Sequence, residues 1–306
     1  MKKLLMSVAV SALMCGAANA ENIGVAMVNT DNPFDQAMLA GIQAEAQRQG
    51  ATLQIEVAEN ELQRQINQVE NFIASKVDAI VVNVVDTDAA PKITELAKTA
   101  GIPLVYFNRQ PVDEAVPEGV GYVGSNELDS GTMQMKEACR LMGGKGNILV
   151  IMGDLANQAA RVRTQDIKDV IATPECSGIQ ILEEQAANWR RTEGMDLMTN
   201  WLSAGHQFDA VISNNDEMAI GAIQALKAAG TDMQKVVVAG IDATPDGLSA
   251  MQAGDLDITV FQDGEGQGAG AVRYALEIVK GAKKGGEMEW IPFKLVTPEN
   301  LSEYLK

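Results

Sequence analysis

Polar side chains of a few recurring types follow the short apolar runs of the sequence, at the places where strands would end. Amide, carboxylate and guanidinium groups can each make two hydrogen bonds from one planar group, and a hydroxyl both donates and accepts. Such residues suit a neutral ligand rich in hydroxyl groups, with aromatic rings against its C–H faces. The candidate residues are Asn32, Phe34, Asp35, Asn108, Arg109, Arg161, Trp189, Asn215, Asp242 and Gln262.

Each candidate also has a purely structural explanation. Asn and Asp after strands are common in turns and as helix N-caps. Phe34 alone would fit a hydrophobic core, and Arg161 and Arg163 alone would fit a solvated helix face. Turn chemistry, however, does not require Arg109, Gln262 or Trp189 at a strand end. The binding hypothesis therefore depends on the whole set and not on any single member.

The elements that would position these residues alternate between strands and helices. Short β-branched runs predict strands, and longer segments of helical period between them predict helices. Three of these helices end at Gly50, Gly101 and Gly230, where a left-handed residue is needed. Near-continuous apolar strands indicate a parallel sheet covered by helices on both faces. The predicted strands are Ile23–Val28, Leu53–Val57, Ala79–Val85, Leu104–Phe107, Ile148–Met152, Ile179–Glu183, Ala210–Ser213, Val236–Ile241 and Ile258–Phe261.

The alternation occurs twice, which predicts two similar lobes. Residues 78–101 are echoed by residues 209–230, each a strand followed by a helix and a glycine. We therefore expect an α/β fold of two doubly wound parallel-sheet lobes joined by a three-crossing hinge, with the ligand outside the carboxyl ends of the strands. The predicted lobes are residues 21–124 plus 263–291 and residues 125–262 plus 292–306, and the predicted hinge lies at Gly124–Asn126, Gln262–Asp263 and Ile291–Phe293.

The net charge and residues 1–20 indicate which partners to expect and where the protein is located. A formal charge of −17 argues against nucleic acid as a partner, because phosphate backbones are bound by clustered Lys and Arg. Residues 1–20 have the pattern of a secretory signal peptide: Lys2 and Lys3, a short apolar run, and a small-x-small cleavage site at Ala18–Ala20. A lipid-modified Cys15 is the weaker alternative, because Met14 stands where a small residue is expected. We therefore expect an exported protein.

Two cysteines lie outside the predicted signal peptide, Cys139 and Cys176. An exported protein enters a compartment that permits disulfides, so we predict a bridge between them. Two buried free thiols are the alternative. The two cysteines and the lone His206 form no cluster with zinc spacing, so neither a metal nor a cofactor is expected.

A catalytic hypothesis stands beside the binding hypothesis. Asp35, Asp216 and Asp242 could supply the paired carboxylates of a glycosidase or an isomerase. The amides and arginines that accompany them would keep these carboxylates ionised, which leaves no evident acid of raised pKa. Gly266–Ala271 fits a dinucleotide-binding pattern but has too little chain after it, and we interpret it as close helix–sheet packing. We therefore expect a protein that is not an enzyme.

Longer motifs give the chain a resemblance to a known family. Asn32-Pro33-Phe34, Asn108-Arg109, Ala159–Arg161, Asn215–Ala219 and Gly240–Asp246 resemble the type I periplasmic sugar-binding proteins of ABC importers, the ribose- and galactose-binding group. Within that group the chain is most similar to the myo-inositol-binding members. The stretches that carry this narrower similarity are Cys139–Gly146, Arg161–Ile167, Thr173–Gly178 and Asn188–Thr192.

This resemblance implies a monomeric periplasmic receptor that captures a cyclic polyol or monosaccharide, with myo-inositol as the expected ligand. It implies delivery to an inner-membrane ABC permease, with a chemoreceptor as a further possible partner. The ligand shell that it implies contains every candidate above except Asp35. Asp35 stands where the ribose pattern has a second Phe, and Asn108 where it has Asp, so a ligand with more hydroxyl groups than ribose is expected. An aldose such as ribose or galactose is the alternative.

Overall fold

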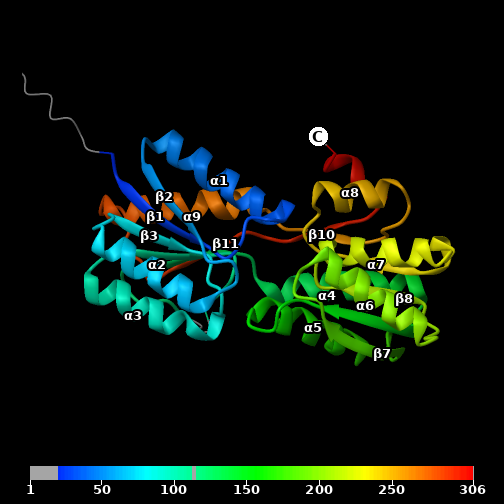
Figure 1. Ribbon diagram of the computed structural model, residues 1–306. Helices are drawn as coiled ribbons and strands as arrows, with labels where there is room; N and C mark the ends of the chain where they lie inside the picture. The colour runs from blue at the N-terminus through cyan, green and yellow to red at the C-terminus, as the bar shows by residue number, and fades with distance from the viewer. Residues whose placement is uncertain (1–19, 112–114, 306) are drawn as a thin grey trace, which may run out of the picture.

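The computed structural model describes residues 20–111 and 115–305, which form two α/β halves side by side (Figure 1). The first half is built on a six-stranded sheet and the second on a four-stranded sheet, and paired strands within each of these sheets run parallel. The predicted α/β fold with two parallel sheets is therefore confirmed. The predicted signal peptide lies outside the described residues except for Ala20.

The first sheet has the strand order β11-β5-β4-β3-β1-β2 and is covered by helices on both faces. Helices α1 and α9 pack on one face, and α2 and α3 pack on the other. All residues of β3 are buried, as expected for a strand covered on both sides. The bounds are β1 (Asn22–Met27), α1 (Pro33–Gln49), β2 (Thr52–Val57), α2 (Leu62–Ala74), β3 (Ala79–Val82), the 3₁₀ turn η1 (Thr87–Ala89), α3 (Ala90–Ala100), β4 (Leu104–Phe107), β5 (Val120–Gly124), α9 (Gly264–Val279) and β11 (Met288–Trp290).

The second sheet has the strand order β7-β6-β8-β9 and is also enclosed by helices. Helices α6, α7 and α8 pack on one face, and α4 and α5 pack on the other. The bounds are α4 (Glu127–Met142), β6 (Lys145–Met152), α5 (Gln158–Ile171), β7 (Gly178–Ala186), α6 (Arg191–Ser203), β8 (Ala210–Ser213), α7 (Asp216–Ala228), η2 (Met233–Lys235), β9 (Val237–Ala239), α8 (Pro245–Gln252), β10 (Thr259–Phe261), β12 (Lys294–Val296) and η3 (Leu301–Glu303).

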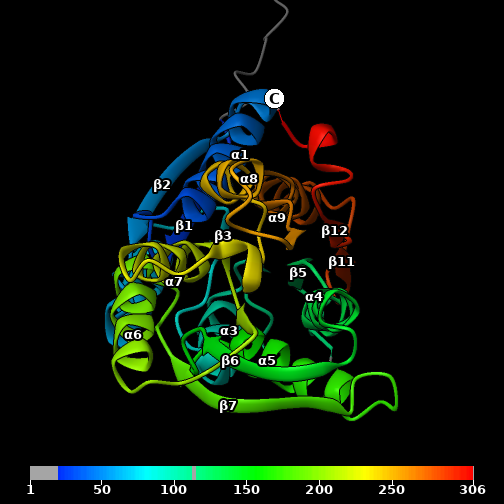
Figure 2. The same ribbon diagram turned by 90° about the vertical axis from the view of Figure 1, so that its right-hand side faces the viewer.

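The chain passes between the halves three times. It does so from β5 to α4, from β10 to α9, and from β11 to β12. Strands β10 and β12 form a small antiparallel sheet, and a bridge between Asp242 and Phe261 joins β10 to the segment after β9. Figure 2 shows the molecule with the second half nearest the viewer. The crossings lie where the sequence predicts a hinge, and the lobe boundaries themselves stay a prediction.

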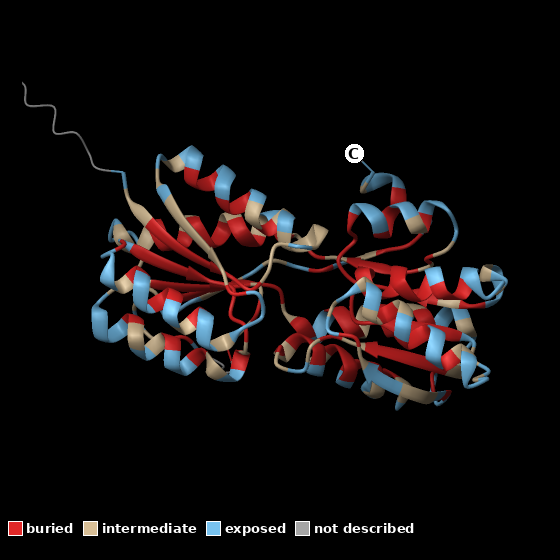
Figure 3. Ribbon diagram, in the orientation of Figure 1, coloured by how far each residue is buried: buried red, intermediate tan, exposed pale blue. Residues whose placement is uncertain are grey.

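Helix α9 returns to the first half and packs closely on α1. A Cβ built on Gly268 would lie 2.1 Å from the carbonyl oxygen of Met38 in α1, and one on Gly270 would lie 2.8 Å from Val123 in β5. The glycine-rich start of α9 thus serves helix packing against both a helix and the sheet. Buried residues fill the central strands of both halves, and the outer helix faces are exposed (Figure 3). No helix within the described ranges is long and apolar enough to cross a membrane.

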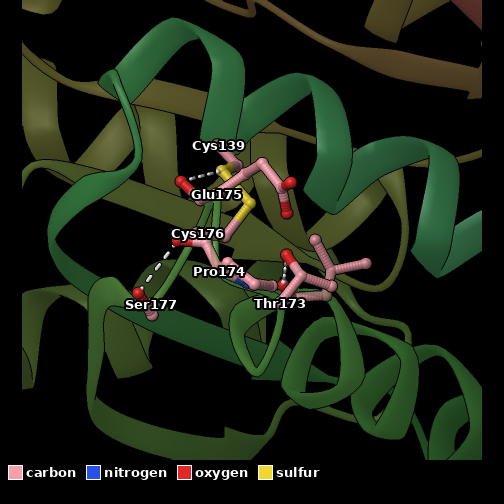
Figure 4. The surroundings of a disulfide bond; sticks show 7 residues. Cys139, Thr173, Pro174, Glu175, Cys176 and Ser177 are labelled. Carbon is pink, nitrogen blue, oxygen red and sulfur yellow. Dashed lines mark hydrogen bonds between the residues drawn. A yellow bond between two sulfur atoms is a disulfide. The ribbon is translucent and has the colours of Figure 1, made fainter.

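The predicted disulfide joins Cys139, near the end of α4, to Cys176, in the turn before β7 (Figure 4). Its Cα atoms are 5.8 Å apart, and the cysteines are separated by 37 residues. Closing a loop of this length restricts the unfolded chain by about 4 kcal/mol on the loop-entropy model. Gly144 packs beside the bridge, where a Cβ would lie 2.3 Å from the carbonyl oxygen of Glu175. The disulfide therefore fixes α4 against the segment that leads into β7.

Candidate ligand-binding cavity

A cavity of about 470 Å³ lies between the halves, at the carboxyl ends of the strands. This volume is within the range of small-molecule sites, about 300–1,000 Å³. The first half contributes Asn29, Asp31, Asn32, Phe34, Asp35, Asn60, Asn108 and Arg109. The second half contributes Glu127, Asn157, Ala159, Arg163, Asn188, Trp189, Arg190, Arg191, Thr192, Asn215, Glu217, Asp242 and Gln262. The lining is mainly polar and comes from both halves.

The N-terminus of α1 brings three predicted site residues to the cavity. Asn32 caps the helix, because its Oδ1 accepts the backbone N–H of Asp35 at 2.9 Å. Its Nδ2 donates to Asp35 Oδ2 at 2.6 Å, which orients the carboxylate. Phe34 packs against Gly264 of α9. Burial raises the pKa of Asp35 to about 7, against the opposing effect of the Arg109 charge. Asp35 is therefore a cavity carboxyl of raised pKa, and the expectation that its amide and arginine neighbours leave no such acid is wrong.

The turn after β4 places Asn108 and Arg109 in the cavity wall. Asn108 has φ 61°, a left-handed conformation that asparagine adopts more readily than most residues. Its Nδ2 donates to Gln267 Oε1 at 3.0 Å, and its Oδ1 accepts from Asn83 Nδ2 at 3.2 Å. The buried Arg109 donates through Nη1 to the carbonyl oxygen of Val85 at 2.8 Å. Both side chains are thus held in place by neighbours in the first half.

Arg163, on α5, is held by several partners in the second half. Its Nε and Nη2 donate to the two carboxylate oxygens of Glu127 at 2.7 and 3.1 Å. Its Nη1 donates to the carbonyl oxygen of Asn214, and Nη2 also donates to Gln262 Oε1 at 3.1 Å. Burial opposes the charge, but Glu127 and Asp242 raise the pKa of Arg163 above its usual value. Arg163 therefore neutralises Glu127 and fixes the orientation of the Gln262 amide.

Trp189 lines the cavity from a strained turn after β7. Asn188 and Trp189 have φ 49° and 67°, and a left-handed backbone is unusual for so bulky a residue as tryptophan. The indole lies against Gly153, where a Cβ would be 2.1 Å from the ring, so the space for the ring depends on that glycine. The Arg163 Cζ atom lies 5.6 Å from the ring centre, in a cation–π arrangement. These contacts fix the ring at the cavity wall.

Two buried donors of the lining are without a partner. Trp189 Nε1 and Gln262 Nε2 make no hydrogen bond with any of the residues that the structure describes. Buried polar atoms normally have a partner, so these two atoms are exceptions, and both are covered by protein atoms in this conformation. Asp242, at φ 124°, adds a buried carboxyl whose pKa is raised well above the usual value by burial, an effect that the nearby Arg163 opposes. The cavity thus offers donors and acceptors side by side.

The charges of the lining nearly balance. Arg163 pairs with Glu127 at 2.7 Å, and Arg191 pairs with Glu217 at 2.7 Å. The acidic residues of the lining are Asp31, Asp35, Glu127, Glu217 and Asp242, and the basic residues are Arg109, Arg163, Arg190 and Arg191. An anionic ligand would need an excess of positive charge. This lining suits a neutral polar ligand instead, and within the described residues no group of three His, Cys, Asp or Glu could hold a metal ion.

The structure brings together all predicted site residues but one. Asn32, Phe34, Asp35, Asn108, Arg109, Trp189, Asn215, Asp242 and Gln262 line the cavity, and their contact with a ligand stays a prediction. The prediction for Arg161 is wrong in one respect, because this side chain does not line the cavity. It donates instead to Asp88 and to the carbonyl oxygen of Leu155. Residues two apart on a helix point about 200° apart, so Arg163 faces the cavity and Arg161 faces away from it.

The sequence prediction missed several residues of the lining. Glu127 stands at the first turn of α4, directly after a crossing, and it follows no apolar run that would single it out. Asn60 follows β2, where a search of strand ends could have found it. Arg190 and Arg191 follow Trp189 and lead into α6. Their charges suit an exposed helix start equally well, so position in the sequence alone does not identify them.

Comparison with known proteins identifies the family. Residues 23–283 match the family model described as "Periplasmic binding protein domain". The chain belongs to the periplasmic binding protein family. Proteins of this family are non-enzymatic, so the glycosidase or isomerase hypothesis is wrong for this periplasmic binding protein.

One relative and two solved structures illustrate the similarity. A putative rhizopine-binding protein of Rhizobium meliloti is 55% identical over 306 residues, covering 99% of each chain. A crystal structure of an ABC transporter solute binding protein from Bacillus halodurans with bound myo-inositol is 42% identical, with TM-score 0.87, and the match covers 94% of this chain and 98% of that one. A myo-inositol binding protein from Caulobacter, also bound to myo-inositol, is 26% identical with TM-score 0.85 and coverage of 92% and 95%. This periplasmic binding protein therefore has the type I fold over nearly all of its length.

Proposed function

We propose that this periplasmic binding protein captures a cyclic polyol of the inositol class and delivers it to an ABC importer. The observation that carries the proposal is the cavity itself. Both halves supply its lining, and the charges of the lining nearly balance. Arginine and amide donors stand in this lining beside two carboxyls of raised pKa. A ring that carries a hydroxyl on each carbon can donate to such carboxyls and accept from such donors around its whole edge.

The relatives support the same class of ligand. The Bacillus halodurans protein holds myo-inositol, and the Rhizobium meliloti relative is named for rhizopine, an inositol derivative. We propose myo-inositol as the first ligand to test and a rhizopine as the second.

Binding would work by closure of the two halves about the three crossings. A ligand shifts such an equilibrium only through its differential affinity for the closed state. Contacts from one half alone would exist in the open state too, and so would give no shift. Asp35 and Arg109 come from the first half, and Trp189, Asp242 and Gln262 from the second, so a ligand that touches both sets would favour closure.

The remaining parts of the proposal concern the surroundings of the protein. We propose that residues 1–20 direct export to the periplasm and are removed there, and that the ligand-loaded monomer docks on an inner-membrane permease. A chemoreceptor is a further partner that the same closed form would suit.

An aldose is the second candidate ligand. A ribose import binding protein of Salmonella typhimurium is 30% identical over 287 residues, covering 92% of this chain and 94% of that one. The cavity volume suits a pentose or a hexose as well as a cyclitol. The carboxyl of Asp35 adds an acceptor to the cavity wall, which favours the ligand with more hydroxyl groups.

Thermal unfolding with a panel of ligands tests the proposal. A ligand present at a hundred times its Kd stabilises the protein by about 2.7 kcal/mol. For a chain of this size we expect that to raise Tm by roughly 5–10 °C. The panel contains myo-inositol, scyllo-inositol, a rhizopine, ribose, galactose, glucose and xylose. The proposal expects the large shift with an inositol or a rhizopine, and a shift with ribose or galactose alone would contradict it.

A further inference from the structure

We propose that Thr87 and Arg161 are positioning residues that hold the two halves together beside the cavity and so strengthen binding of every ligand without touching any. The group consists of Thr87 and Asp88 from the first half and Ala156, Gln158 and Arg161 from the second, here called the Thr87 contact. The inference rests on the proposed function in one respect only, that the halves separate and close around a ligand.

The geometry of the Thr87 contact is that of a specific junction. Thr87 begins the turn η1 before α3, and Ala156 and Gln158 stand at the start of α5. The backbone N–H of Thr87 donates to the carbonyl oxygen of Ala156 at 3.1 Å, and Thr87 Oγ1 donates to the same oxygen at 3.2 Å. The backbone N–H of Gln158 donates to Thr87 Oγ1 at 3.2 Å. Thr87 is 0% exposed, so the tip of a connecting loop is fully buried against the other half.

Arg161 extends this contact to the surface. Its Nη2 donates to Asp88 Oδ1 at 3.1 Å and to Thr87 Oγ1 at 3.4 Å. Its Nη1 donates to the carbonyl oxygen of Leu155 in its own half. The side chains of Arg161 and Asp88 are 39% and 65% exposed, so solvent screens this ion pair and its contribution is small. Thr87 therefore contributes more than the Arg161–Asp88 ion pair to the stability of the joined conformer.

The Thr87 contact lies beside the ligand cavity, next to the lining residues Asn157 and Ala159, and away from the crossings. None of Thr87, Asp88, Ala156, Gln158 and Arg161 lines the cavity. Strand β3, which leads to Thr87, is separated from β5 by β4, and β6, which leads to Ala156, is separated from β9 by β8. The contact thus joins the halves at a distance from the connections that would act as a hinge. Its residues can change the conformational equilibrium without changing the ligand shell.

The affected equilibrium is the one between joined and separated halves. When the halves separate, the polar groups of Thr87 exchange their protein partners for water, at a modest net cost for each hydrogen bond lost. A valine at position 87 keeps the backbone N–H that donates to Ala156 and loses only the contacts of Oγ1. In the joined conformer alone, the Gln158 N–H is then left without Oγ1 as its acceptor. Apparent affinity is proportional to the fraction of binding-competent protein, so the Kd of every ligand should rise by the same factor.

The experiment compares Thr87→Val and Arg161→Ala with a matched control. Lys168→Ala removes another ion pair of α5, with Glu184 at 2.8 Å, that stays within the second half. Calorimetry measures Kd for myo-inositol and for one weaker ligand of the thermal panel. In Thr87→Val the Kd should rise about five- to tenfold, as for loss of one buried hydrogen bond. In Arg161→Ala it should rise about twofold, because the ion pair is exposed. The factor should be the same for both ligands, with faster dissociation, and Lys168→Ala should match the wild type.

A readout without ligand keeps this inference separate from the choice of ligand. Single-molecule energy transfer between one dye on each half reports the fraction of closed molecules in the free protein. This fraction should fall in Thr87→Val and stay unchanged in Lys168→Ala, whichever ligand the protein binds. If no polyol binds the wild type, the proposed ligand class is wrong. The closed fraction of the free protein then decides by itself whether the Thr87 contact favours the closed state. An unchanged closed fraction, or a change in Kd for one ligand only, would overturn the proposal.

Discussion

At the scale of single residues, the cavity depends on side chains that the protein itself holds in place. Arg163 uses most of its donors on Glu127, Asn214 and Gln262, and so shapes the cavity more than it offers free donors to a ligand. Trp189 occupies a left-handed backbone position and lies on Gly153. Such strained conformations persist where the surrounding structure fixes them, and they gather at functional sites.

Trp189→Phe tests the unpaired indole donor. The substitution keeps an aromatic ring against Gly153 and removes Nε1, which is buried with no partner among the described residues. If Nε1 donates to the ligand, calorimetry should show a Kd for myo-inositol raised about fivefold, as for one hydrogen bond of about 1 kcal/mol. Trp290→Phe, at an exposed position on β11, is the control and should bind like the wild type. Equal Kd values for all three proteins would show that Nε1 does not donate a hydrogen bond to the ligand.

At the scale of elements, helix α5 combines three roles on different faces. Arg163 faces the cavity, Arg161 faces the first half, and Asp166 is buried where α4 and α5 pack together, close to Gly131 of α4. Burial, together with the nearby Asp169 charge, raises the pKa of Asp166 to about 7. Its Oδ2 has no hydrogen-bond partner in the described part of the chain. This helix interface therefore contains a carboxyl that is costly to ionise.

Asp166→Asn should stabilise the protein, and more so at high pH. The folded-state pKa lies above the unfolded value of 3.8, so the folded protein binds more protons and loses stability as pH rises from about 4 to about 7. Asparagine does not titrate and avoids this loss. Chemical unfolding should show a gain on the order of 1–3 kcal/mol at pH 8, a smaller gain at pH 5, and little at pH 3.

The control for this prediction is Asp196→Asn, at an exposed position on α6. Surface substitutions of this kind usually change stability by less than about 0.5 kcal/mol. A gain from Asp166→Asn that is the same at pH 3 and pH 8 would show that ionisation of Asp166 does not oppose folding.

At the scale of the whole molecule, two separate cores are joined by three crossings and by the Thr87 contact. Each half has its own buried sheet with helices on both faces. In the described ranges, the core clusters of each half contain no helix of the other half, so the halves can move as units about the crossings. Hinge motion of this kind changes the cavity and leaves both cores intact.

Small-angle scattering tests this motion directly. Saturating myo-inositol should lower the radius of gyration of the wild-type protein, because ligand contacts from both halves favour the closed state. Asp242→Asn removes a buried carboxyl of the cavity and should need more ligand for the same decrease. Galactose at equal concentration is the comparison ligand. A radius of gyration that stays constant while calorimetry shows binding would contradict closure.

Much of this architecture could be predicted from local sequence patterns. Apolar β-branched runs specify buried strands, their alternation with helices specifies parallel sheets, and carboxyl ends of parallel strands converge on one edge. Asn32, Asn108 and Asp242 could therefore be placed together without coordinates. Strand β5 was not predicted, because it contains two glycines, Gly121 and Gly124. Strands β11 and β12 were not predicted, because each has only three residues and one of them is charged.

Only the tertiary structure decided what depends on rotation and on contacts between distant segments. The sequence does not say which of Arg161 and Arg163 faces the cavity, because the rotation of α5 is set by its packing against α4 and β6. It also does not show that Glu127 neutralises Arg163 across 36 residues, or that Thr87 is buried against Ala156. Short-range patterns determine elements and their ends, whereas these pairings form only when the two sheets are placed relative to each other.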